Sequence, residues 1–117
     1  MWQIEVVYVK EWIMGLDRWT YQSVFGALEL LTLHGPALGR PLVDTVHGSQ
    51  NRIMKELRPP SPGRSEIRIL FAFDPQRQAV LLVGGDKSNE WRKWYDKNIP
   101  RADRLWEEHL ISIQDRN

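Results

Sequence analysis

The chain has 117 residues, 42% of them apolar and 26% charged, which are values typical of one soluble globular domain with a single core. It contains no cysteine, and this excludes a disulfide scaffold, a thiol nucleophile and a thiolate metal site. The net charge of +1 hides a central excess of positive charge, because residues 1–46 sum to −2, residues 47–97 to +4 and residues 98–117 to −1. We therefore expect one domain over residues 1–117, with its cations concentrated in the middle.

The N-terminal residues do not resemble a targeting segment. No basic stretch precedes their apolar run, and Glu5 interrupts it, so a signal peptide is not expected. No apolar run in the chain approaches the ~20 residues of a membrane span. The sequence therefore predicts a cytoplasmic protein without a membrane partner.

The N-terminal third predicts one strand and two helices. Residues 3–9 are rich in β-branched residues and predict the first strand. Residues 11–16 predict a short helix, and Asp17 is placed to cap a second helix that continues to about Leu33. The segment His34-Gly35-Pro36 is expected to end that helix. Apolar residues recur on it at spacings of 3, 4 and 3 and predict its buried face: Tyr21, Val24, Leu28 and Leu31.

The middle of the chain predicts a group of strands. Residues 36–52 are expected to form a loop with a short extended piece at 42–47. Residues 79–83 are apolar on both faces, so their strand is expected inside the sheet, with helices on both sides. The three predicted strands of this region are residues 53–58, 66–73 and 78–84, with a hairpin turn at Asp74-Pro75-Gln76-Arg77 between the last two.

The C-terminal third predicts two more helices. Ser88 or Asn89 can cap a short helix that continues through Tyr95, and Asn98 with Pro100 is expected to start a second one. The second helix has the clearest amphipathic stripe of the chain: Ile99, Ala102, Trp106, Leu110 and Ile113. The predicted order β-α-α-β-β-β-α-α indicates a small α+β fold, with a twisted, mainly antiparallel sheet packed by two N-terminal helices and by C-terminal helices.

Arg68 is the residue that most directly suggests chemistry, because it interrupts an apolar strand. Strand alternation places it on the face of Glu66, Leu70 and Ala72. One interpretation is an ion pair across strands with Glu66 or Glu56. The other is a site for an anion such as a phosphate, which we favour because several further cations are expected near Arg68: Lys55, Arg58, Arg64 and Lys87.

Histidines and aromatic residues supply further candidates. His47 is the histidine that could serve as a general acid or base, whereas His34 is expected at a helix end and His109 beside the apolar stripe of the last helix, at the boundary of its buried face. Trp91, Trp94 and Tyr95 are interleaved with cations, including Lys93, and this pattern is typical of surfaces that stack RNA bases. The remaining tryptophans are expected in the core or at its edge: Trp2, Trp12, Trp19 and Trp106.

Five short motifs, taken in order, make the chain similar to a known family. They are Lys-Glu-Leu-Arg-Pro (55–59), Arg-Ile-Leu-Phe-Ala-Phe-Asp-Pro (68–75), Gly-Asp-Lys (85–87), Trp-Tyr (94–95) and Ile-Pro-Arg-Ala-Asp (99–103). In this order the chain resembles the phage-derived, HigB-like branch of the RelE/ParE toxin superfamily. The resemblance implies a RelE-like domain and the toxin of a type II toxin–antitoxin system. It also implies a ribosome-dependent mRNA endonuclease, or mRNA interferase, that inhibits translation.

The chemistry that the resemblance implies needs neither a metal nor a cofactor. A ribose 2′-hydroxyl attacks the adjacent phosphate, and cationic side chains stabilise the charge that develops. Arg68 matches the family's strand arginine, while Lys55, Arg58 and Lys87 match its basic positions. Proton transfer falls to candidates among three residues, Tyr95, Lys87 and His47. Further RNA contacts are expected from Arg64, Trp91 and Lys93.

The resemblance also implies partners and leaves alternatives open. The expected partners are the messenger RNA, the ribosome and a cognate antitoxin, expected to be a helix-turn-helix protein from an adjacent gene through which operator DNA is contacted. One departure from the family is a long C-terminal helix in place of a Tyr/His-rich end. The alternatives are a ParE-like gyrase poison that acts by binding, and a catalytically inactive phage-derived binding or regulatory module.

Overall fold

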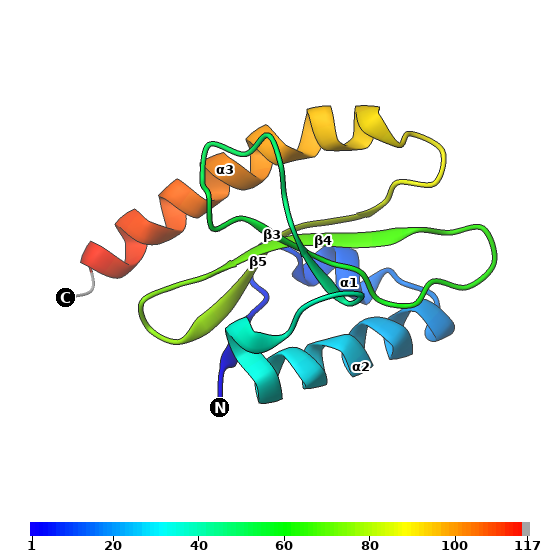
Figure 1. The fold of residues 1–117 in the computed structure, drawn as a ribbon, viewed down its shortest axis with the longest axis horizontal. Helices are drawn as coiled ribbons and strands as arrows, with labels where there is room; N and C mark the ends of the chain where they lie inside the picture. Colours follow the sequence, from blue (N-terminus) through cyan, green and yellow to red (C-terminus); the bar gives the residue numbers. More distant parts are fainter. Residues whose placement is uncertain (116–117) are drawn as a thin grey trace.

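The computed structural model of this protein describes residues 1–115 and contains a five-stranded sheet between two helical layers (Figure 1). The strand order is β1-β5-β4-β3-β2, in which β1 is parallel to β5 and the other neighbours are antiparallel. The strands are β1 (Gln3–Glu5), β2 (Val43–Thr45), β3 (Lys55–Leu57), β4 (Ile67–Phe73) and β5 (Gln78–Asp86). The predicted α+β class and mainly antiparallel sheet are confirmed.

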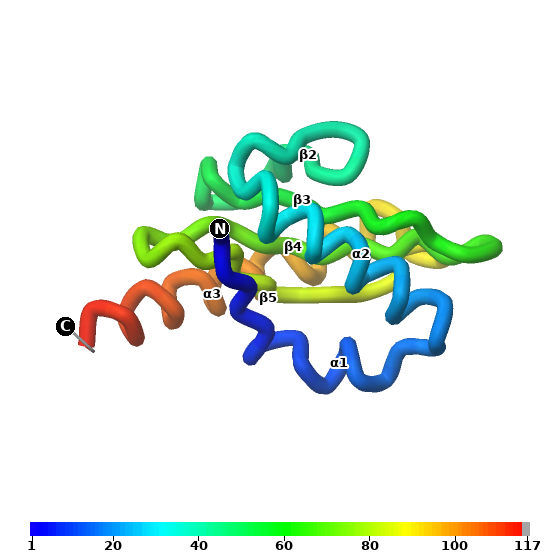
Figure 2. The backbone as a smooth tube through the Cα atoms, turned by 90° about the horizontal axis from the view of Figure 1, so that it is seen from below, coloured from blue at the N-terminus to red at the C-terminus, as the bar shows by residue number. Residues whose placement is uncertain are grey.

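The helices cover both faces of this sheet. The helical segments are α1 (Lys10–Met14), α2 (Arg18–His34), a 3₁₀ turn η1 (Gly35–Ala37) and α3 (Arg92–Asp115). In Figure 2, α2 crosses in front of the sheet and α3 lies behind it. Among the helices of residues 1–115, none combines the length and the apolar character that a membrane-spanning segment needs.

Strand alternation divides the core into two layers, as predicted for β4. Ile67, Ile69 and Phe71 pack on the α2 side of the sheet with Leu57 of β3. Leu70 and Ala72 face the other way and pack against α3, through residues that include Trp94, Ile99, Ala102 and Trp106. Apolar side chains project from both faces of β4 and β5, so the sheet is buried on both sides. The polar residues Glu66 and Arg68 share the α3 side with Leu70 and Ala72.

Helix α2 begins and ends where the sequence indicates. Asp17 Oδ1 accepts a hydrogen bond from the Thr20 backbone N–H at 2.9 Å, and this bond lowers the pKa of the Asp17 carboxyl. Gly35 ends the helix with a φ of 55°, and the ring of Trp2 occupies the space that a Cβ would need. The buried stripe is Thr20, Val24, Ala27 and Leu31.

Three expectations about the N-terminal helices and strand are wrong. Tyr21 is exposed, because the buried face of α2 is centred on the side of Thr20 and Ala27. Trp19 is 74% exposed and is not a core residue. The first strand stops at Glu5 and a turn follows at residues 7–9, since β1 pairs only with the start of β5.

The two predicted C-terminal helices form one continuous helix. Asn98 does not cap a new helix but is buried inside α3, where its side-chain amide donates to the Trp94 carbonyl at 2.9 Å. Pro100 removes one backbone donor, yet it lies on the exposed side of the helix. Continuity is favoured because Trp94, before the proline, and Ala102, after it, pack on the same sheet face.

Two glycines allow this close packing on both sides of β5. The side chain of Trp12 in α1 lies where a Cβ on Gly84 would be, and that of Trp94 in α3 lies where a Cβ on Gly85 would be. Neither glycine ends the strand, which continues to Asp86. The strand was expected to end at residue 84, but it continues, and the two glycines make room for two tryptophan rings.

His109 is buried, although it was expected beside the apolar stripe of the helix, at the boundary of its buried face. Its Nε2 lies 2.8 Å from Oδ2 of Asp74 in the β4–β5 turn. Burial alone would raise the pKa of the Asp74 carboxyl, but hydrogen bonds from His109, Gln78 and Gln76 outweigh burial and lower this pKa below its ordinary value. This buried pair joins the turn to α3.

Candidate active site

The candidate site lies on the α3 side of the sheet and is organised by Glu56. Glu56 pairs with Leu70 in the β3–β4 register, so Arg68, two residues before Leu70, lies diagonally across from it on the same face. The Nε atom of Arg68 is 3.0 Å from Oε1 of Glu56, and its Nη2 is 3.8 Å from Oε1 of Glu66. The interpretation of Arg68 as a cross-strand ion-pairing residue is confirmed.

Two further side chains meet the same carboxylate oxygen. The hydroxyl of Tyr95 donates to Oε1 of Glu56 at 2.8 Å, and Nε of Arg58 donates to it at 3.1 Å. Glu56 is only 4% exposed, so this oxygen depends on protein partners in place of water. A phenol and two guanidinium groups therefore converge on one anionic oxygen.

Arg68 is incompletely satisfied in this arrangement. Its Nη1 donates to the Ile67 carbonyl at 2.8 Å, but its buried Nε–H is not aligned for a hydrogen bond despite its closeness to Glu56. A buried donor without a hydrogen bond costs about 1–3 kcal/mol. Arg68 thus has a donor that a better-placed anionic oxygen would satisfy.

The ammonium group of Lys87 lies over two aromatic rings at the edge of this cluster. Its Nζ is 4.4 Å from the centroid of Trp91 and 5.2 Å from that of Tyr95, and the residue is only 7% exposed. Burial and, after it, the nearby charge of Arg68 lower the pKa of the Lys87 amine. Lys87 therefore gives up its proton more readily than an exposed lysine does.

Tyr95 has the opposite tendency. Burial and then its hydrogen bond to Glu56 raise the pKa of the Tyr95 phenol to about 12. Around neutral pH this side chain is consequently a hydrogen-bond donor and not a base. The pKa values of these two neighbours thus shift in opposite directions, because Tyr95 holds its proton more tightly than usual and Lys87 less tightly.

Arg58 is shared between two carboxylates. Besides Glu56, its Nη2 lies 3.3 Å from Oδ2 of Asp44, which also pairs with Arg40 at 3.2 Å. The side chain of Arg40, more than any other group, lowers the pKa of Asp44. The cluster therefore balances Arg58, Arg68 and Lys87 against the carboxylates of Asp44, Glu56 and Glu66. Its arginines are held by carboxylates, where the sequence suggested a surface of free cations.

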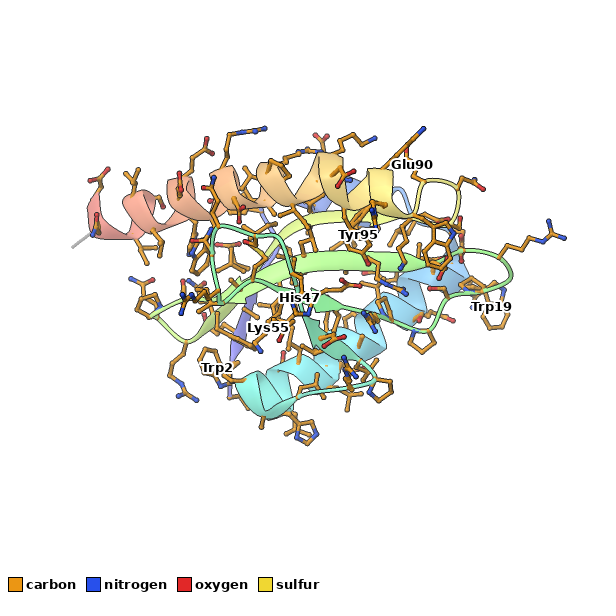
Figure 3. The ribbon with its side chains drawn as sticks, turned by 45° about the horizontal axis from the view of Figure 1, so that its top comes forward. Trp2, Trp19, His47, Lys55, Glu90 and Tyr95 are labelled. Atoms are coloured by element: carbon orange, nitrogen blue, oxygen red, sulfur yellow. The ribbon has the colours of Figure 1, made fainter. Side chains whose placement is uncertain are left out.

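Two adjoining cavities open beside this cluster. The larger, of about 660 Å³, lies between the His47–Gly48 segment and the first turns of α3, and its lining includes Trp91, Tyr95 and Asp96. The smaller, of about 300 Å³, is lined by residues that include Glu56 and Arg58. His47 and Tyr95 line both cavities. Figure 3 shows these two labelled residues coming from a loop and from α3.

A buried aspartate holds the loop that carries His47. Asp103 of α3 accepts hydrogen bonds from the Ser49 hydroxyl at 2.5 Å, the Gln50 backbone N–H at 3.0 Å and the Asn51 side-chain amide at 3.0 Å. This anchoring keeps residues 47–51 against α3. The loop crosses the helix in Figure 1.

The structure brings together six of the nine predicted site residues: Arg68, Lys87, Tyr95, His47, Arg58 and Trp91. Three others lie apart from the cluster. Lys55 shares the α2 side of the sheet with Leu57, whereas Arg64 is exposed in the β3–β4 loop and Lys93 on α3. Lys55 and Tyr95 are well separated in Figure 3.

The sequence reasoning missed two parts of the site. Glu56 was considered only as an ion-pair partner, because the register that places it on the face of Arg68 comes from the pairing of β3 with β4. Asp103 was not singled out at all. The sequence gives little indication of the role of Asp103, because nothing in it shows that the loop at residues 49–51 packs against α3.

The sequence matches one described protein family and two named relatives. Residues 11–107 match the family described as "Phage derived protein Gp49-like (DUF891)". A Mycobacterium tuberculosis (strain H37Rv) protein named "Putative toxin HigB2" is 55% identical over 114 residues, which are 97% of this chain and 57% of that relative. A second protein of the same organism, "Putative toxin HigB3", is 54% identical over 104 residues, which are 89% of each chain.

The chain thus spans little more than half of the first relative and most of the second. The family match covers the strands, the loop and the part of α3 that build the Glu56 cluster. The relationship to phage-derived, HigB-like proteins that the motifs predict is therefore confirmed, and the chain belongs to the Gp49-like family.

Proposed function

We propose that this protein is the toxin of a type II toxin–antitoxin system and that it cleaves messenger RNA on the ribosome. Both relatives are named as toxins, and they share more than half of the aligned residues with this chain. A toxin of this kind needs a cognate antitoxin to neutralise it. The messenger RNA and the ribosome are the other proposed partners.

The observation that carries this proposal is the convergence of Tyr95, Arg58 and Arg68 on one oxygen of Glu56 beside an open cavity. Phosphate oxygens accept hydrogen bonds from the same donors as carboxylate oxygens. A scissile phosphate that enters the cavity would compete with Glu56 for these donors and would satisfy the unaligned Nε–H of Arg68. The three donors would then stabilise the negative charge of the phosphorane.

Two protons must move in the reaction that we propose. The 2′-hydroxyl loses a proton as its oxygen attacks phosphorus, and we assign Glu56, once released from its donors, as the acceptor. The P–O5′ bond then breaks, leaving a 2′,3′-cyclic phosphate and a 5′-oxygen that needs a proton. We assign this proton to His47 because its side chain lines both cavities, whereas Lys87 is covered by aromatic rings. Lys87 contributes its positive charge beside Arg68 and Tyr95.

The test is to induce the protein in a bacterium and to map the 5′ ends of its messenger RNAs at nucleotide resolution. We expect new ends within translated regions for the wild-type protein, and a loss of about tenfold or more for Arg68→Ala, because a hydrogen bond to a charged group contributes about 1.5–3 kcal/mol. Arg18→Ala is the matched control, since Arg18 is an exposed arginine at the start of α2. It should cut as the wild-type protein does.

Two results would contradict the proposal. Unchanged cleavage by Arg68→Ala, at matched expression, would remove Arg68 from the phosphate site. Growth arrest with a DNA-damage response and without new RNA ends would support the gyrase poison instead.

A further inference from the structure

We propose that the cavity between His47 and α3 is a nucleobase pocket in which Trp91 stacks on an unpaired base and Asp96 selects guanine. The inference rests on the proposed function only in taking RNA as the substrate. It adds a source of sequence preference, which the phosphate cluster cannot supply because every nucleotide carries the same phosphate.

The size and position of the cavity suit a base next to the scissile phosphate. Its volume of about 660 Å³ is within the ~300–1,000 Å³ that is usual for small-ligand sites. It adjoins the smaller cavity that Glu56 and Arg58 line, and Tyr95 belongs to both. A nucleotide whose phosphate lies near Arg58 could therefore place its base, or that of its neighbour, in the larger cavity.

Trp91 is held in an unusual conformation at the edge of this cavity. Its backbone has a φ of 44°, which bulky side chains rarely adopt, and its N–H donates to the Lys87 carbonyl at 2.7 Å. The ammonium of Lys87 lies over its indole ring, yet the residue remains 58% exposed. The indole therefore has surface left for a second partner, and an outlying backbone conformation at a cavity is typical of a functional position. Single-stranded bases commonly stack on such rings.

Asp96 supplies the selectivity. It lies one residue after Tyr95 on α3, lines the same cavity and is exposed to it. A carboxylate only accepts hydrogen bonds, so it favours a base edge with donors. Guanine alone has two adjacent N–H donors on its Watson–Crick edge, and both can bind one carboxylate. Cytosine and adenine offer a single amino group beside an acceptor nitrogen, which a carboxylate repels.

The opposite wall is fixed in place. Val46 is buried and its N–H donates to the Met54 carbonyl, while Ser49 and Gln50 are bound by Asp103. His47 and Gly48 lie between these two anchors and line the cavity. The pocket thus has a rigid wall, and it can select a base without reorganising the loop.

The direct test does not depend on cleavage. Each of the four nucleoside 5′-monophosphates is titrated into isotopically labelled full-length protein, and NMR follows the Trp91 indole N–H and the backbone amides of Gly48 and Asp96. We expect guanosine monophosphate to bind about fivefold more tightly than the other three, and Asp96→Asn to abolish that preference. Trp91→Gly, which suits a positive φ, should weaken all four by about tenfold, whereas Trp91→Phe should keep part of the affinity.

Matched controls use exposed residues outside the cavity. Glu108→Gln changes a carboxylate on the same helix, and Trp19→Ala removes an exposed tryptophan from α2. Neither should alter nucleotide binding. Equal binding of the four monophosphates by wild-type protein, or signals that move elsewhere, would overturn the inference.

A second measurement separates this inference from the proposed function. The mapped RNA ends should show guanine enrichment at one position near the cut, and Asp96→Asn should lose that enrichment while still cutting. If guanosine monophosphate binds as expected but no RNA is cut, the pocket stands and the proposed activity fails. If RNA is cut while the monophosphates do not bind in the cavity, the activity stands and the pocket fails.

Discussion

At the scale of single residues, Glu56 determines where the hydrogen-bond donors of the candidate site lie. Its buried carboxylate holds Tyr95, Arg58 and Arg68 in one place. The same contacts pair the arginines with a carboxylate, and this pairing offsets part of the desolvation penalty of a buried cluster of charges. An incoming phosphate must therefore exchange partners with Glu56.

Tyr95→Phe should separate cleavage from binding. We expect RNA cleavage to fall by about tenfold to a hundredfold because a donor to the phosphate is lost, with RNA binding unchanged because the ring remains. Since the pKa of Tyr95 is raised to about 12, its ionisation should not shape the wild-type pH profile between about pH 6 and pH 9. Rates of single-turnover cleavage and filter binding of uncleavable RNA measure the two effects. Equal rates for the variant and the wild type would exclude a role for the hydroxyl.

Lys87→Met should stabilise the protein and reduce its activity. The pKa of Lys87 is lower in the folded protein than in the unfolded chain, so the unfolded chain binds the proton more tightly. Below the folded-state pKa, the positive charge of Lys87 therefore lowers the free energy of unfolding. At neutral pH we expect a gain of about 1 kcal/mol for methionine, a size typical of such replacements. The gain should shrink as the pH rises toward 10.5, where the wild-type lysine loses its charge in both states. Thermal unfolding at several pH values measures this, and a lower Tm for the variant at neutral pH would contradict it.

At the scale of elements, α3 carries both Tyr95, one of the catalytic candidates, and Asp103, the anchor of the facing loop. Tyr95 and Asp103 are two turns apart on one side of the helix, and Pro100 between them does not interrupt it. The cavity is therefore built by one helix and by the loop that this helix holds. Two separate helices, as the sequence suggested, would not have fixed the positions of Tyr95 and Asp103 relative to each other.

Asp103→Ala should release that loop. Three donors would lose their acceptor, so we expect a loss of about 1–3 kcal/mol in unfolding free energy and faster hydrogen exchange at residues 47–51. Cleavage should fall as well, because His47 would no longer be held beside Tyr95. The control is Asp115→Ala, at an exposed position of the same helix. Unchanged exchange in the loop would show that other contacts hold it.

At the scale of the whole molecule, the buried Asp74–His109 pair links the tip of the β4–β5 hairpin to the C-terminal half of α3. The other end of α3 lies at the candidate site. The helix is therefore attached to the sheet at a point remote from the cavity.

Asp74→Asn should show that the stability contributed by the Asp74–His109 pair is lost in acid. Because hydrogen bonds keep the pKa of Asp74 below its ordinary 3.8, the carboxylate contributes stability above that value and loses it as the pH falls through the folded-state pKa. We expect the variant to be less stable by about 2–4 kcal/mol near neutral pH, with the difference shrinking as the pH falls below 3.8. Urea unfolding at pH 7, 5 and 3 tests this, and a difference that is as large at pH 3 as at pH 7 would argue against it.

The amino-acid sequence by itself determined most of the local structure and the family. Asp17, Gly35 and the strand alternation of β4 act through neighbouring residues, so the helix cap, the helix end and the two faces of the sheet followed directly from the order of residues. The same alternation placed Arg68 on the face that carries the site.

Only the tertiary structure decided which polar groups meet. Glu56, Tyr95 and Lys87 come from three different elements, and their contacts arise when α3 packs over β4 and β5. His109 and Asp103 look like surface residues of an amphipathic helix, yet partners far along the chain bury them. Lys55 lies close to Glu56 in sequence but on the opposite face of the sheet. Ion pairing and burial depend on distance in space, and a sequence pattern reports that distance only within a single helix or strand.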